Sequence, residues 1–147
     1  MLHRRNLFRV LLTMTVLATA AGCQQPAPPE AACTFHQVHF GEGSILMDAD
    51  DVQTINTVTR LASAPGARVI LVGKTDTVGS RAANMRLSKR RADNVNKALI
   101  DNGVPPDRIS WFYTGEAAPV VATGNDEAEA ANRVVRIAVG VDCPRPS

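Results

Sequence analysis

The chain has 147 residues, which is enough for one domain preceded by a targeting segment. Its apolar content of 45% suffices for a core, and its formal net charge is +2. Arg4, Arg5 and Arg9 account for this excess, since residues 23–147 hold 13 Lys and Arg against 14 Asp and Glu. This balance, with no basic run interleaved with aromatic residues, argues against nucleic acid as a partner.

Residues 1–22 are typical of a secretory signal peptide, with a basic start, an apolar run and small residues before Cys23. Ala20-Ala21-Gly22-Cys23 resembles a bacterial lipobox, which implies cleavage and an N-acyl diacylglycerol anchor on Cys23. Ordinary cleavage with Cys23 as a free thiol is the alternative. Gln24, by resemblance to enterobacterial sorting signals, points to the periplasmic face of the outer membrane. Residues 23–34 then form a lipidated, proline-rich tether that reaches about 30 Å.

The remaining sequence alternates between strand and helix patterns in the order β-α-β-α-β-α-β. Helices between successive strands require a sheet that is at least partly parallel, which predicts an α/β fold with helices packed on a mixed four-stranded sheet. The expected strands are 36–40, 68–73, 108–113 and 133–139. The expected helices are one capped by Asp48 or Asp50 with an inward stripe of Val52, Ile55, Val58, Leu61 and Ala62, a long one at 81–102, and a short one at 126–131.

The most informative stretch is the loop after the apolar strand 69–72, because ligands of α/β sheets bind at the carboxyl ends of strands. Asp76 lies in this loop. On the helix that follows, Arg91 occupies the apolar stripe between Leu87 and Val95, where an unpaired charge is costly. Two interpretations stay open: a structural Asp76–Arg91 ion pair, or a shared site for a zwitterionic ligand.

The domain holds two cysteines, Cys33 and Cys143. In an oxidising compartment a disulfide is favoured, and it requires the first and last strands to be antiparallel neighbours. Two free surface thiols are the alternative. His36 and His39 are not a metal site, because residues i and i+3 of a strand face opposite sides.

Several motifs resemble the OmpA-like peptidoglycan-binding domain. They are Val72-Gly-x-Thr-Asp76, Asn84-x-x-Leu-Ser-x-x-Arg-Ala92, Gly115-Glu-x-x-Pro119 and Asn132-Arg133. The resemblance covers about residues 35–141 and implies a domain at 35–143 with a tail at 144–147. A lipid anchor followed directly by this domain resembles the layout of peptidoglycan-associated lipoproteins (Pal).

The resemblance implies that Asp76 and Arg91 bind the diaminopimelate of a peptidoglycan stem peptide, with Asp76 on its ammonium and Arg91 on its carboxylate. Asn84, Thr75 and Arg133 are the expected further contacts. The sequence departs from the family pattern at Lys74, usually histidine, at Gly41, often acidic, at Tyr113, often glycine, and at Val134, often arginine.

The leading functional hypothesis is a non-enzymatic outer-membrane lipoprotein that tethers the membrane to peptidoglycan, without a cofactor or metal. The alternative is a protein-interaction module of a Tol-Pal or secretion-type envelope complex with weak or no peptidoglycan binding. An enzyme is disfavoured, because both domain histidines lie on one expected strand and both domain cysteines are better paired, which leaves no plausible Ser-His-Asp or Cys-His set. Gly73-Lys74-Thr75 is not the end of a P-loop, since Arg68 stands where the first glycine is needed.

Overall fold

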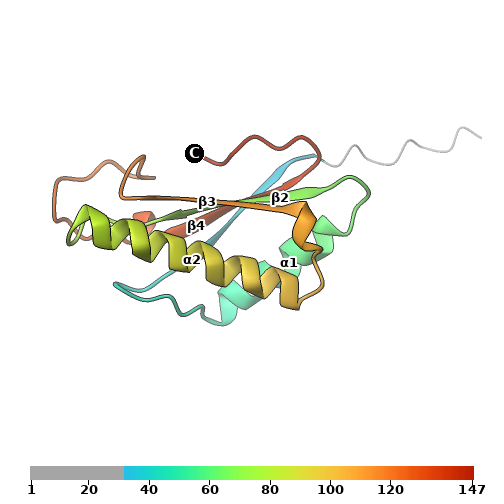
Figure 1. Cartoon of the computed structure of the whole chain (residues 1–147), viewed down its shortest axis with the longest axis horizontal. Helices are drawn as coiled ribbons and strands as arrows, with labels where there is room; N and C mark the ends of the chain where they lie inside the picture. Colours follow the sequence, from blue (N-terminus) through green and yellow to red (C-terminus); the bar gives the residue numbers. More distant parts are fainter. Residues whose placement is uncertain (1–31) are drawn as a thin grey trace, which may run out of the picture.

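The computed structural model describes residues 32–147, so the predicted signal peptide and Cys23 lie outside the described residues. The elements follow one another along the chain as alternating strands and helices (Figure 1). They are β1 (Thr34–His39), α1 (Ala49–Ala62), β2 (Arg68–Lys74), α2 (Arg81–Asp101), the 3₁₀ helix η1 (Pro106–Arg108), β3 (Ile109–Gly115), the 3₁₀ helix η2 (Ala130–Asn132) and β4 (Val134–Gly140).

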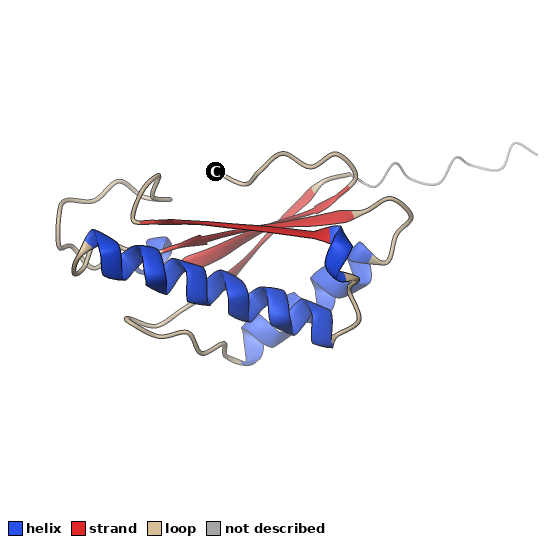
Figure 2. Ribbon diagram, viewed as in Figure 1, coloured by secondary structure: helices blue, strands red, loops and turns tan. Residues whose placement is uncertain are grey.

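The four strands form one mixed sheet in the order β1-β4-β2-β3. β2 and β3 are parallel, whereas β4 is antiparallel to both β1 and β2. This confirms the predicted α/β fold and the antiparallel pairing of the first and last strands. Both long helices cover one face of the sheet, and the segment after β4 crosses the other (Figure 2).

The core lies between the sheet and the two helices. Of the stripe expected on α1, Leu61 is only partly buried and Val52 is 47% exposed. Asp51 takes the inward place in this turn, where its carboxylate accepts hydrogen bonds from the backbone N–H of His39 and of Asp48. Asp48, one of the two caps expected, is the N-cap of α1. The buried apolar residues of the main cluster include Val38, Ile55, Val58, Val69, Leu71, Val95, Leu99, Val135, Ile137 and Val139.

The prediction of a helix at 126–131 is wrong. This part of the chain is a loop that ends in η2. Asp126 has a φ of 55°, in the left-handed region, which a right-handed helix cannot continue through. Its carboxylate accepts a hydrogen bond from the N–H of Gly79, while the N–H of Glu127 donates to the Thr77 hydroxyl. Contacts with another loop therefore replace the local helix.

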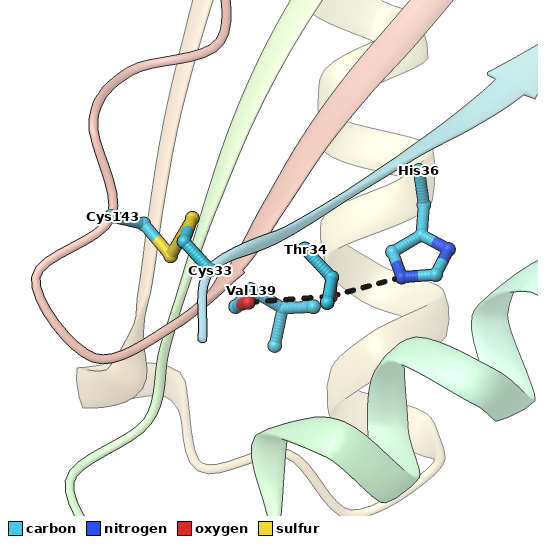
Figure 3. The surroundings of a disulfide bond; sticks show 5 residues. All are labelled: Cys33, Thr34, His36, Val139 and Cys143. Atoms are coloured by element: carbon cyan, nitrogen blue, oxygen red, sulfur yellow. Dashed lines mark hydrogen bonds between the residues drawn. A yellow bond between two sulfur atoms is a disulfide. The ribbon is translucent and has the colours of Figure 1, made fainter. Parts of the chain in front are cut away.

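The two domain cysteines are bonded to each other, which confirms the predicted disulfide. Cys33 precedes β1 and Cys143 follows β4, with their Cα atoms 5.4 Å apart although they are separated by 110 positions in sequence (Figure 3). Beside the bond, the Thr34 hydroxyl donates to the carbonyl of Val139, and His36 lies within hydrogen-bonding distance of the same hydroxyl. The disulfide thus closes one end of the β1–β4 pair.

Gly73 sets the distance between α2 and the sheet. A Cβ atom at this position would lie 2.2 Å from the backbone oxygen of Ser88 and 3.1 Å from the Cβ of Ala92. Both atoms belong to α2, so any larger residue would push the helix away from β2. The close approach brings the buried face of α2 against the end of β2, where the polar residues of the site lie.

Candidate functional site

The candidate site lies at the end of the sheet opposite the disulfide. β2 and β3 end there because they are parallel, and β4 begins there because it is antiparallel to them. The first turn of α2 and the loop between β1 and α1 complete this end. Four segments distant in sequence are therefore brought together by the topology alone.

Asp76 is a nearly buried anion whose partner is Arg133. Its Oδ2 lies 3.1 Å from Nη1 of Arg133, and the two side chains are 7% and 17% exposed. Arg133 also donates through Nε to the carbonyl of Phe40, at 3.2 Å. The structure thus differs from the interpretation in which Asp76 pairs with Arg91: the residue just before β4 supplies the cation instead.

Arg91 is fully buried and binds backbone carbonyls. Its Nε, Nη1 and Nη2 donate to Ser44, Lys74 and Gly41 at 2.9, 3.1 and 2.9 Å. Burial lowers the pKa of Arg91 to about 10, with the nearby Asp76 raising it and Arg133 lowering it. The guanidinium therefore stays protonated at neutral pH and ties the loop after β1 to the end of β2.

Thr75 and Asn84 also lie at this end, and both are buried. The N–H of Thr75 donates to the carbonyl of Gly115, whereas its hydroxyl has no hydrogen-bond partner among the described residues. Nδ2 of Asn84 donates to Oε2 of Glu116 at 2.8 Å, and Oε1 of Glu116 lies 3.3 Å from Nε of Arg81. The structure thus brings all five predicted binding residues to one end of the sheet.

Glu116 was not among the residues predicted to bind a ligand, yet it lies at the same end of the sheet. This carboxylate follows β3 directly and faces the first turns of α2, where it bonds Arg81 and Asn84. The signal that pointed to Asp76 applies here as well, because Glu116 follows the parallel strand next to β2 and the carboxyl ends of such strands meet at one edge.

An accessible cavity of about 470 Å³ lies between the loop after β2 and the loop after β3, and its lining begins at Thr77, the residue after Asp76. The Thr77 hydroxyl donates to the carbonyls of Gly124 and Glu127, which holds the two loops together. Ser80, the N-cap of α2, lines this cavity. Its lining residues are Thr77, Gly79, Ser80, Glu116, Asn125 and Asp126.

The four residues that differ from the family pattern lie in different parts of the fold. Lys74 is buried, and its amine donates to the carbonyl of Ala118 rather than contacting Asp76. Burial and the nearby Arg136 lower its pKa. Gly41 contributes one of the three backbone carbonyls that bind Arg91, and Val134 is buried in β4. Tyr113 is 39% exposed and stacks on Trp111.

Within residues 32–147, no three His, Cys, Asp or Glu side chains gather in a way that could hold a metal ion. No helix in this described part is long and apolar enough to cross a membrane.

Residues 39–133 match the OmpA family. The chain belongs to this family. It is 35% identical over 121 residues to the peptidoglycan-associated lipoprotein of Pseudomonas putida, an alignment that covers 82% of this chain and 70% of that protein. It is 34% identical over 109 residues to the peptidoglycan-binding protein ArfA of Mycobacterium tuberculosis, covering 74% of this chain and 33% of ArfA.

Among solved structures, the peptidoglycan-associated lipoprotein of Burkholderia pseudomallei has a similar fold, with a TM-score of 0.65 and 23% identity. The match covers 70% of this chain and 88% of that one. The chain spans only 26% to 61% of the length of three further curated relatives, so the OmpA family domain is one part of those proteins.

Proposed function

We propose that this OmpA family chain is a lipid-anchored envelope protein that binds peptidoglycan without catalysis and so holds the outer membrane close to the cell wall. The observation that carries the proposal is the set of charges at the end of the sheet, where the buried Asp76 and Arg91 and the partly buried Arg133 lie, together with a polar cavity lined by Thr77, the residue after Asp76. The names of the relatives, which include a peptidoglycan-associated lipoprotein and a peptidoglycan-binding protein, support it.

The chemistry of the site suits a ligand that carries both charges, as the free end of a diaminopimelate side chain does. Asp76 accepts a hydrogen bond from the ligand's ammonium, and the guanidinium groups of Arg133 and Arg91 attract its carboxylate. The N–H groups at the start of α2 add a positive field on the same side. Asn84 and Thr75 complete the proposed contacts, and the Thr75 hydroxyl, which has no partner within residues 32–147, supplies a further hydrogen-bonding group.

Replacing Asp76 with asparagine should weaken binding to purified sacculi at least tenfold, about 1.4 kcal/mol, because the amide keeps the shape and loses the charge that attracts the ammonium. The measurement is co-sedimentation with sacculi over a range of protein concentrations. Asp107→Asn, at an exposed carboxylate outside the site, is the matched control and should bind as wild type. Wild-type affinity in the folded Asp76→Asn protein would reject the site. A wild-type chain that fails to bind sacculi would favour the protein-interaction alternative.

The anchor is the second part of the proposal. Substituting Cys23 with serine should abolish incorporation of radiolabelled palmitate and move the protein from the outer-membrane fraction to the soluble periplasmic fraction, because no acyl chains can then be attached. Fractionation of cells and labelling are the measurements. Labelling that persists in the Cys23→Ser variant would place the anchor elsewhere.

A further inference from the structure

The surface of α2 that faces away from the sheet is strongly basic. Arg86, Lys89, Arg90 and Lys97 are all exposed, and we call them the basic face of α2, with Lys89 at its edge, where its amine lies over the ring of Trp111 in β3. Arg86, Arg90 and Lys97 are four and seven residues apart, which places them along one line of the helix. The buried side of the same helix carries Asn84, Ser88, Arg91, Ala92, Val95 and Leu99.

Half of this charge is not neutralised within the domain. Lys89 pairs with Asp93 at 2.7 Å and Lys97 with Asp101 at 2.5 Å. Neither Arg86 nor Arg90 forms an ion pair with a carboxylate of residues 32–147 (the described part of the chain). Two adjacent guanidinium groups, one helical turn apart, therefore face the solvent.

Helix stability does not account for this arrangement. Cations are unfavourable near the positive N-terminal end of a helix, yet α2 has no acidic residue in its first turn and no basic residue in its last. In both side-chain pairs the lysine precedes the aspartate, which is the weaker orientation for pairs four residues apart. The charges of α2 are therefore placed opposite to what the helix dipole and the pair orientation favour. This suggests that the basic residues bind an anion outside the domain.

The position of the basic face indicates which anion this is. Arg86 is six residues after the N-cap Ser80, so it lies about 9 Å along the helix from the cavity of the candidate site. The chain enters the domain at Cys33, at the opposite end of the sheet. The two unpaired arginines are therefore on the half of α2 that flanks the proposed wall-binding site, away from the attachment to the membrane.

We propose that the basic face of α2 binds the carboxylates of a second peptidoglycan stem peptide, next to the one held at Asp76; this rests on the proposed function. Stem peptides bear several free carboxylates and recur along the glycan strand, so a polymer bound at the site presents further anions beside α2. Arginine binds carboxylates through two parallel hydrogen bonds, which matches the exposed Arg86 and Arg90. The contact adds affinity for the polymer and none for a single stem peptide.

The test compares Arg86→Gln/Arg90→Gln with Arg60→Gln/Arg68→Gln, which removes the same charge from exposed arginines on other elements. Each is measured on intact sacculi and on a soluble muropeptide with one stem peptide. We expect the α2 variant to bind sacculi about fivefold to tenfold more weakly at low salt, with a shallower dependence on salt, and to bind the muropeptide as wild type does. The control should stay within about twofold of wild type on both ligands.

The inference fails if the α2 variant binds sacculi as tightly as wild type, or if the control loses as much affinity. It also fails if the α2 variant instead loses binding to vesicles containing anionic phospholipid while its affinity for sacculi is unchanged, since the partner would then be a membrane. Retained binding of Asp76→Asn to the muropeptide would reject the proposed site independently of these results.

Discussion

Replacing Arg91 with methionine should lower the free energy of unfolding by about 3 kcal/mol. Methionine keeps much of the apolar length but loses the donors that bind the carbonyls of Ser44, Lys74 and Gly41. The Lys74 carbonyl is left unpaired in the interior, whereas the two loop carbonyls can regain water. Equilibrium unfolding in urea, followed by circular dichroism, measures the change.

Arg90→Met is the control, because the neighbouring arginine is exposed and has no ion-pair partner among the described residues. Its unfolding free energy should change by no more than about 0.5 kcal/mol. If Arg91→Met unfolds like wild type yet loses affinity for sacculi, Arg91 acts on the ligand and not on the fold. A loss of both would show that it holds the loops in place and also contributes to binding.

Removing the disulfide by Cys33→Ser/Cys143→Ser should lower the unfolding free energy by about 2–5 kcal/mol, because the bond closes a long loop and restricts the unfolded chain. The loss should appear in urea as a lower midpoint. Wild-type protein unfolded in the presence of a reductant should reach the same midpoint, while the double variant should not respond to the reductant. A difference below about 1 kcal/mol would mean that the β1–β4 pair holds the chain ends together without the bond.

The fold was predictable because its elements carry strong local patterns. The apolar run of β2 and the periodic stripe of α2 place a strand and a helix on either side of Asp76, and the cysteines fix β1 beside β4. The failures occurred where a long-range contact overrides the local pattern. The residues at 126–131 have helical composition, but hydrogen bonds to Thr77 and Gly79 hold them as a loop.

The residues of the site could be predicted from the sequence, but the groups to which they bind could not. The strand end and the buried stripe identified Asp76 and Arg91, but their partners lie far along the chain. Asp76 binds Arg133, 57 residues away, and Arg91 binds carbonyl oxygens, which every residue possesses and no sequence pattern distinguishes. Glu116 was missed although it obeys the same strand-end rule as Asp76, because no charged partner stands near it in sequence.

The geometry at the disulfide has a consequence for how such a domain is built into larger proteins. The domain begins at Cys33 and ends after Cys143, and the Cα atoms of these two residues are 5.4 Å apart. The two points at which the domain joins a longer polypeptide therefore lie side by side. A unit whose ends meet can be joined to either side of another domain, or inserted within it, without disturbing its own packing. The polar site lies at the far end and stays accessible in each arrangement. Such a geometry is compatible with a domain match that covers 70% of one relative and 26% of another.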